Sequence, residues 1–411
     1  MSAERPLRVL VAGGGIAALE LLLAVRAAAG DRCALTLITP DPSLRYRPES
    51  VAEPFSGPRA RAIPWMPIAR ALGVELIDGR VHSVLAETEV VLDDERRIGF
   101  DELVIAAGAH QVDGVAHAST FRPEAADELH WVIDELEQEE TESLVLVAPR
   151  RCGWTLPLYE LALMAAARVT AACGDPGRIT VVTYEHAPLE AFRGPGSDAV
   201  AQLLAKARVH LVTGHEVTRY DGERLELHPH ASLPAGRVVA LPELVGPRIH
   251  GLPLDGHGFV RVDEQFAVEG REHVHAIGDA ASFALKQGGL ATQQADAVAS
   301  LIAARAGSSH PVHPFEPRLR AILWTGADPL YLTATAIGAE TVASAVSKRC
   351  PWWPVEKIAA VHAAPFLSDV EELGTVAAVS RLAVAGSTPA ATPVIHAAAG
   401  DPGVELLARD A

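Results

Sequence analysis

The first forty residues alternate two short apolar runs with a longer helical pattern. Residues 7–12 and 34–39 have the length and composition of buried strands. Three glycines, residues 13–15, follow the first run, and residues 19–29 are rich in alanine and leucine, which favours a helix. The pattern therefore predicts a βαβ unit at the start of the chain.

The glycine turn carries Gly13, Gly15 and Ala18 at the spacing of a dinucleotide-binding fingerprint. In that fingerprint the first glycine permits a tight turn, the second lets a pyrophosphate approach the backbone, and the small third residue lets the helix pack on the strand. The amino terminus of the helix then faces the phosphates. Such turns also occur where a strand and a helix simply pack tightly, so the motif alone leaves both interpretations open.

The carboxylate that usually accompanies this fingerprint is missing. It normally closes the second strand and binds a ribose, but here the strand ends at Thr39 and the next carboxylate is Asp41. Asp41 either takes over this contact or is a plain turn aspartate. Further along, the apolar strand 101–109 ends in small residues, including Ala107 and Gly108, which permit close approach of a backbone or a ligand.

A second βαβ pattern has strands expected at 144–148 and 178–183 around a helix near 158–168. Its first turn, 149–157, lacks the second and third glycines and contains bulky residues, which argues against ordinary NAD(P)H binding. Glu185, after the second strand, nevertheless stands where a carboxylate could hold an adenosine ribose.

Composition and charge narrow the function classes. The chain of 411 residues is long enough for two or three domains, and 52 acidic against 35 basic side chains give a formal charge of −17, which disfavours nucleic acid as a partner. Four dispersed cysteines favour a reducing cytoplasm, and scattered histidines argue against a bound metal. No signal peptide or membrane span is expected, and the acidic stretch 120–140 is interpreted as a solvated connector.

Several motifs, taken in order, resemble those of one flavoprotein superfamily. Residues 13–18, the strand end 106–109 and the late strand end 276–279 are together similar to the FAD-dependent pyridine nucleotide-disulfide oxidoreductases, which have two dinucleotide-binding domains. Residues 46–55 and 286–296 look like the branch near the sulfide:quinone reductases and type II NADH dehydrogenases.

The resemblance, which covers residues 7–367, implies an α/β fold with two Rossmann-like dinucleotide-binding domains, the second inserted in the first, plus a C-terminal segment. The expected boundaries are 1–115 and 241–320 for the FAD-binding domain, 116–240 for the degenerate NAD(P)-binding-like domain and 321–411 for the C-terminal interface or capping segment. The expected cofactor is non-covalent FAD, with NAD(P)H as a candidate second nucleotide. The residues expected to hold FAD are Gly13, Gly15, Ile16, Ala17, Ala18, Asp41, Arg47, Ala107, Gly108, Gly278, Asp279, Gly288, Gly289 and Leu290.

Charged residues beside this cofactor are candidates for its chemistry. Asp279 at a strand end can accept hydrogen bonds from the ribityl chain, and the helix that starts near Gly288 aims N–H groups at the flavin pyrimidine. Glu160 falls where the superfamily often has a glutamate beside the flavin; proton relay there requires a pKa raised by burial, and the alternative is a helix-surface carboxylate. Lys286 either favours the reduced, anionic flavin or is a solvated surface lysine.

Cys152 and Cys350 are the remaining catalytic candidates, because a thiolate near a flavin is how the sulfide-oxidising branch takes up sulfur. Buried, idle thiols are the alternative. Neighbouring basic residues are expected to lower the pKa of each thiol: Arg150, Arg151, Lys348 and Arg349.

Aromatic and apolar residues near the C-terminus could wall a pocket for a quinone, form dimer contacts or lie in the core: Trp352, Trp353, Phe366 and Leu367. Acidic residues after Ser368 argue against a stable membrane anchor. We therefore expect a cytoplasmic FAD-dependent oxidoreductase, with a homodimer as candidate assembly, that passes electrons from NAD(P)H or a sulfide-like donor to a small, quinone-like acceptor. The alternative is a flavin-binding protein with a regulatory or scaffold role.

Overall fold

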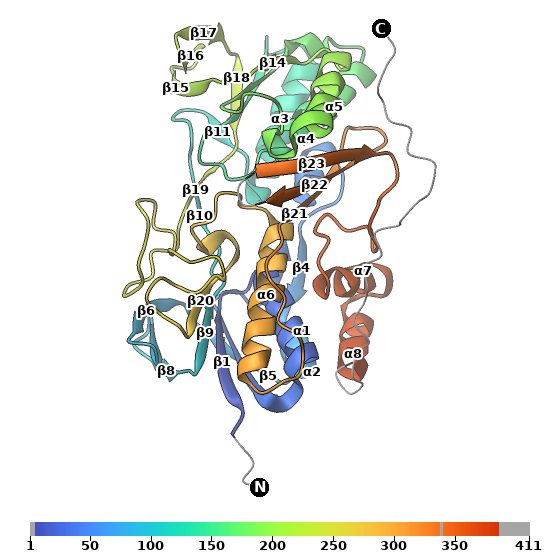
Figure 1. The fold of residues 1–411 in the computed structure, drawn as a ribbon. Coiled ribbons are helices and arrows are strands. Elements are labelled where there is room, and N and C mark those ends of the chain that lie inside the picture. Colours follow the sequence, from blue (N-terminus) through green and yellow to red (C-terminus); the bar gives the residue numbers. More distant parts are fainter. Residues whose placement is uncertain (1–4, 338–339, 386–411) are drawn as a thin grey trace.

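The computed structural model describes residues 5–337 and 340–385. They form a mixed α/β fold built around two parallel sheets of five strands each (Figure 1). This confirms the predicted fold class of two Rossmann-like units. The part of the C-terminal segment beyond residue 385 lies outside the described residues.

The first large sheet combines four strands from the first 105 residues with one strand from residues 274–276, which lies at its edge. All its neighbouring strands are parallel, and residue 7 of the first strand lies opposite residue 33 of the second. In spatial order the strands are β20 (Val274–Ala276), β9 (Glu102–Ile105), β1 (Leu7–Ala12), β2 (Cys33–Thr39) and β5 (Val74–Asp78).

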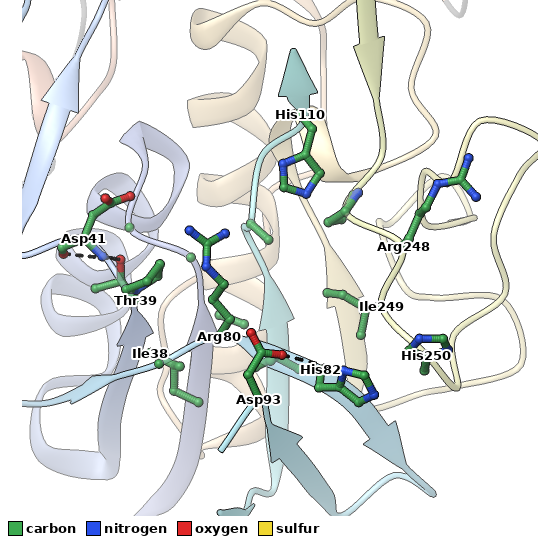
Figure 2. Close-up of a pocket in the computed structure, with 18 residues that line it drawn as sticks. Ile38, Thr39, Asp41, Arg80, His82, Asp93, His110, Arg248, Ile249 and His250 are labelled. Carbon is green, nitrogen blue, oxygen red and sulfur yellow. Dashed lines mark hydrogen bonds and ion pairs between the residues drawn. The ribbon is translucent and has the colours of Figure 1, made fainter. Parts of the chain in front are cut away.

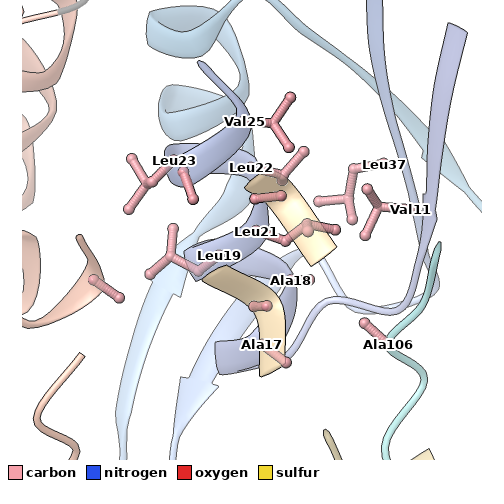
Figure 3. Close-up of a cluster of buried hydrophobic side chains, with 14 of the residues drawn as sticks. Val11, Ala17, Ala18, Leu19, Leu21, Leu22, Leu23, Val25, Leu37 and Ala106 are labelled. Atoms are coloured by element: carbon pink, nitrogen blue, oxygen red, sulfur yellow. The ribbon is translucent and has the colours of Figure 1, made fainter. Parts of the chain in front are cut away.

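Helix α1 (Ile16–Ala29) is mainly apolar in sequence because most of its side chains are buried. Leu19, Leu21 and Val25 are fully buried, and the helix packs on the sheet and on α6 (Gly288–Arg305) (Figure 3). A helix that is buried over most of its circumference consists mainly of apolar residues, and the buried Glu20 is the exception that has hydrogen-bond partners of its own. The glycine turn that precedes α1 is therefore fixed by a large core.

The second large sheet repeats the arrangement with residues from the middle of the chain. Helices α3 (Ala126–Glu137), α4 (Leu156–Ala171) and α5 (Arg193–Lys206) accompany it. Its strands are β11 (Ser119–Thr120), β18 (Arg237–Ala240), β12 (Leu144–Ala148), β13 (Ile179–Thr183) and β14 (His210–Val212), in spatial order.

The acidic stretch 120–140 is not the solvated connector that its charge suggested. Most of it forms α3, whose Leu129, Ile133 and Leu136 are buried in the core beside α4. The acidic residues cover only the outer side of an amphipathic helix, because its apolar residues recur with helical spacing.

Within the described residues, the remaining strands form five small antiparallel sheets. β21 contacts both α4 and α6 and so links the two halves of the molecule. The strands are β3 (Ser43–Tyr46) with β4 (Arg61–Pro64); β6 (Val81–Leu85), β7 (Glu89–Leu92) and β8 (Arg97–Gly99); β10 (His110–Val112) with β19 (Glu243–Val245); β15 (Glu216–Tyr220), β16 (Arg224–His228) and β17 (Ala231–Pro234); and β21 (Arg318–Leu323), β22 (Leu330–Ile337) and β23 (Glu340–Ser347).

A segment that we call the strap, residues 356–363, ties the C-terminal part to both halves. Glu356 accepts a hydrogen bond from Arg61 at 2.7 Å, and the N–H group of Ile358 donates to the hydroxyl of Tyr46 at 3.1 Å. The strap leads into α7 (Ala363–Leu373) and α8 (Thr375–Ala385), and α8 packs on α2 (Trp65–Leu72). No helix of the described part of the chain has both the length and the apolar character needed to cross a bilayer.

A buried pair of carboxyl groups anchors the end of the strap. Glu20 of α1 is fully buried and accepts hydrogen bonds from three successive backbone N–H groups, those of residues 361–363. Burial and the adjacent Glu20 carboxylate raise the pKa of Asp296 well above its ordinary value. The raised pKa favours the protonated form of Asp296, which can donate a hydrogen bond to the Glu20 carboxylate.

Replacing Asp296 with asparagine should make thermal unfolding less sensitive to alkaline pH. Because the pKa of Asp296 is higher in the folded than in the unfolded state, its contribution to stability is complete below the ordinary aspartate pKa and is lost as the pH rises through the raised value. The wild-type melting temperature should thus fall relative to that of Asp296→Asn as the pH rises from about 5 into the alkaline range. A difference that stays constant over this range would contradict the protonated pair.

Candidate functional site

The glycine turn after β1 has the backbone geometry that a dinucleotide requires. Gly13 has φ +118°, and a Cβ atom there would lie 2.2 Å from the carbonyl oxygen of Ala106, so only glycine fits between the ends of β1 and β9. A Cβ atom on Gly15 would meet nothing within 4 Å. The start of α1 therefore opens onto free space beside the turn, and the predicted residues Ile16, Ala17 and Ala18 form its first turn.

A cavity of about 260 Å³ lies at this carboxyl edge of the first sheet (Figure 2). Gly13, Asp41 and Ala107, all predicted cofactor residues, line it together with Thr39 and Arg80. Ligands in open α/β sheets bind outside the carboxyl ends of the strands. The cavity is consistent with the adenosine end of a dinucleotide site.

The end of β20 adds a second group of predicted residues. Gly278 has φ +64°, and a Cβ atom there would lie 3.4 Å from the Cβ atoms of both Ala17 and Ala291, so this turn packs tightly between α1 and α6. Burial raises the pKa of Asp279, and the nearby cations Lys286 and Arg47 oppose this shift. The fold thus brings Arg47 close to Asp279 and Lys286, which belong to one loop much later in the chain.

Lys286 is held inside the structure and is not a solvated surface lysine. Its Nζ atom donates hydrogen bonds to the carbonyl oxygens of Ala281 and, at 3.3 Å, of Asp279, and it lies 3.9 Å from the ring centre of Phe259. Burial lowers the pKa of Lys286 to about 8. Lys286 therefore keeps most of its positive charge near neutral pH.

The amino terminus of α6 is only partly free. The side chain of Gln287 caps it by accepting a hydrogen bond from the N–H group of Leu290 at 2.9 Å. The predicted residues Gly288 and Gly289 are the first two residues of this helix. Gly288 must remain small, because a Cβ atom there would lie 2.4 Å from Cδ1 of Ile358 on the strap.

Glu160 occupies the buried position that proton relay requires. Its carboxylate lies 2.7 and 2.9 Å from Nζ of Lys357 and accepts a hydrogen bond from the backbone N–H of Trp324 at 2.9 Å. Burial raises the pKa of Glu160 and lowers the pKa of Lys357, while their mutual attraction opposes both shifts. The sequence analysis did not single out Lys357. Its position directly before the apolar residues 358–360 was a signal that could have done so.

In the second βαβ unit, the carboxylate that was expected to bind a ribose is hydrogen-bonded to groups of the protein itself. Glu185 is buried and accepts hydrogen bonds from Thr155 at 3.0 Å, from Tyr159 at 2.5 Å and from the N–H group of Glu190 at 2.8 Å. In addition, Pro157 in the first turn of α4 has no N–H group to offer a phosphate. The Glu185 carboxylate is therefore already saturated at the place where a ribose would bind.

The basic residues beside Cys152 do not lower its pKa, contrary to expectation. Arg150 and Arg151 form ion pairs with Glu216 and Glu243. Cys152 itself is buried, which raises the pKa of its thiol to about 12. At neutral pH this thiol is therefore protonated.

Cys350 lies in different surroundings, beside Arg320 and Tyr331, and burial also raises the pKa of its thiol. Arg320, and not the expected Lys348 or Arg349, is the cation that lowers the pKa of this thiol, and desolvation outweighs its effect. Within the described residues, no group of three metal-ligating side chains is found.

The aromatic residues near the C-terminus do not form one pocket wall. Phe366 and Leu367 are core residues that pack against α1, and the indole N–H of the buried Trp352 donates to the carbonyl oxygen of Glu356. Trp353, in contrast, is 78% exposed. Of the alternatives considered, the core is thus correct for Phe366 and Leu367.

Brief alkylation with iodoacetamide at about pH 8 should modify Cys173 and leave Cys152 unmodified in the folded protein. Cys173 is exposed, whereas Cys152 is buried and its thiol pKa is about 12. Peptide mass spectrometry measures the extent of alkylation of both cysteines in one sample. Equal labelling of the two cysteines would show that Cys152 is an accessible thiolate.

Comparison with known proteins agrees with this geometry. Residues 7–297 match the sequence profile of the family described as pyridine nucleotide-disulphide oxidoreductase. No curated protein matches the chain at a significant level.

Among solved structures, the sulfide:quinone oxidoreductase from the hyperthermophilic bacterium Aquifex aeolicus has a TM-score of 0.72 and 19% identity, over 83% of this chain and 86% of that one. The ferredoxin reductase for the CYP199A2 system from Rhodopseudomonas palustris has a TM-score of 0.60 and 21% identity, over 80% and 83%. An NAD-dependent persulfide reductase from A. fulgidus has a TM-score of 0.54 and 17% identity, over 80% and 64%. At these identities the likeness concerns the fold. Since the family profile spans most of the sequence, the chain belongs to the pyridine nucleotide-disulphide oxidoreductase family.

Proposed function

We propose that the protein is an FAD-dependent oxidoreductase that passes electrons from a small donor to a small acceptor. The observation that carries this proposal is the meeting of predicted cofactor residues at one edge of the first sheet, where Gly13, Gly278 and Asp279 follow parallel strands. When bound there, FAD supplies the two-electron chemistry that side chains lack.

The residues present fit this cofactor. The open turn at Gly15 and the start of α1 suit the pyrophosphate, because N–H groups at a helix amino terminus bind phosphates. Asp279, which follows β20, would accept hydrogen bonds from the ribityl hydroxyls. Lys286 and the start of α6 would lie beside the flavin pyrimidine, where their positive charge favours the reduced form.

Glu160 and Lys357 are suited to move the proton that accompanies electron transfer. Burial raises the pKa of Glu160 and lowers that of Lys357, which reduces the difference in proton affinity between the two groups. Their contact of 2.7 Å allows direct transfer between carboxylate and amine. This pair favours an enzyme over a purely regulatory flavin-binding protein.

The donor that we favour is a small reductant other than NAD(P)H. Glu185, the only expected ribose ligand of the second unit, already accepts hydrogen bonds from Thr155 and Tyr159. A sulfide-like donor would have to react without Cys152 as a ready thiolate, since the pKa of that thiol is about 12. Quinones are the first acceptors to test, because one protein of the same fold is named a sulfide:quinone oxidoreductase.

The purified protein should carry a flavin absorbance that neither NADH nor NADPH bleaches, because the second nucleotide turn is filled by the chain itself. Anaerobic titration with NADH, NADPH, sulfide and dithionite, followed by a quinone analogue, separates the cases. Protein from FAD-replete cells without flavin absorbance would contradict the cofactor. Rapid bleaching by NADH or NADPH would contradict the closed second site and leave the flavin assignment intact.

The Glu160→Gln variant should lose about 3 kcal/mol of unfolding free energy, because it leaves the Lys357 ammonium buried without its partner. The double variant Glu160→Gln with Lys357→Met removes both charges and should recover most of that stability. Reoxidation of the flavin by a quinone should nevertheless stay about 100-fold slower in both variants, because both lack the Glu160 carboxylate that exchanges the proton with its partner.

Denaturant unfolding and stopped-flow absorbance of the flavin measure these two quantities. If the double variant recovered its turnover together with its stability, the pair would be structural and would have no part in proton transfer.

A further inference from the structure

The adenosine end of the first nucleotide site has lost its usual acceptor. In such sites a carboxylate at the end of the second strand accepts hydrogen bonds from the ribose hydroxyls. Here β2 ends at Thr39, whose hydroxyl already accepts the N–H group of Asp41 at 3.2 Å. The next carboxylate, Asp41, lines the cavity from the loop after the strand, so the strand end itself offers no carboxylate to the adenosine half of a cofactor.

A buried hydrogen-bond donor without a partner lies next to this position. Trp65, the first residue of α2, is fully buried, and its indole N–H has no hydrogen-bond partner in the structure. A Cβ atom on Gly14 would lie 2.8 Å from this nitrogen and 2.5 Å from the hydroxyl of Thr39. Because buried donors are nearly always paired, this N–H points to an acceptor that the protein itself does not supply.

The same cavity contains two arginines that no carboxylate neutralises. Arg80 follows β5, whose last residue, Asp78, lies opposite Thr39 in the sheet. Figure 2 shows the Arg80 side chain extending between Asp41 and His110, both of which line the cavity. Among the described residues, neither Arg80 nor Arg248 on the opposite wall has an ion-pair partner, whereas His82 beside them lies 3.6 Å from Asp93.

We propose that Arg80 and Trp65 bind the adenosine diphosphate half of FAD, with donors in place of the missing carboxylate. The Arg80 guanidinium donates to phosphate or ribose oxygens, and the indole N–H of Trp65 donates to an oxygen atom near the Gly14 turn. A diphosphate provides several anionic acceptors, which guanidinium groups bind well. This inference rests on the proposed function and extends it to residues that the family fingerprint does not include.

Binding of FAD to the full-length chain freed of flavin tests the proposal, with quenching of flavin fluorescence as the readout. Arg80→Gln should weaken FAD binding about tenfold and reduce its dependence on salt, because one phosphate contact is lost. Trp65→Phe keeps the ring in the core and removes only the N–H group, so it should weaken binding about threefold to tenfold. Matched controls are Arg70→Gln on the exposed side of α2 and Trp131→Phe on α3, which should bind like the wild type.

Thermal unfolding without flavin separates binding from folding. Trp65→Phe removes an unpaired buried donor, so the flavin-free protein should melt at the same temperature or higher, while the stabilisation by added FAD should be smaller. ADP should compete with FAD less well in both variants. FMN, which has no adenosine half, should show the same affinity in the wild type and the variants.

The outcomes distinguish this inference from the proposed function. If the wild type binds FAD and both variants bind it with unchanged affinity and salt dependence, the inference is wrong and the flavoprotein assignment stands. If the variants weaken FMN as much as FAD, their effect is on the fold as a whole and the inference also fails. If the wild type binds no flavin, the proposed function itself is overturned.

Discussion

The buried ion pair between Glu160 on α4 and Lys357 on the strap is the interaction on which the arrangement of the site depends. Withdrawing two charges from water costs several kcal/mol for each ion, so the pair persists only if its geometry is tight and its remaining hydrogen-bonding capacity is met. The backbone N–H of Trp324 meets part of it. The same constraint fixes the strap relative to α4, and the strap in turn holds Ile358 over the start of α6.

The two βαβ units differ in the residue near the end of their second strand, where dinucleotide-binding proteins often carry a carboxylate. In the first unit, the strand ends at Thr39 instead of a carboxylate, yet the space beside Gly15 is open. The cavity there is lined by Arg80 and Arg248, which form no ion pair with the described residues. In the second unit, Glu185 is present but its carboxylate is consumed by internal donors such as Tyr159. The unit with the expected carboxylate is thus closed, and the unit without it is open. A motif at the right place in the sequence is therefore not sufficient evidence of a binding site.

The two units also contact each other through their turns. The N–H group of Lys286 donates to the carbonyl oxygen of Gly153 at 3.1 Å, and a Cβ atom on Gly153 would lie 2.7 Å from Cβ of Lys286. The degenerate turn of the second unit therefore packs directly on the loop that carries Lys286. This contact fixes the position of the degenerate turn relative to Lys286.

The sequence by itself determined the fold class and the glycine turn, because strand and helix periodicity and the spacing of Gly13 and Gly15 are local properties of the chain. It could propose Glu160 and Asp279 but could not decide their state, since pKa values depend on burial and on charges distant in sequence. Only the tertiary structure paired Glu160 with Lys357, showed that α3 is a packed helix and placed Trp65 beside Gly14. These contacts join segments separated by tens to hundreds of residues, and no local pattern encodes them.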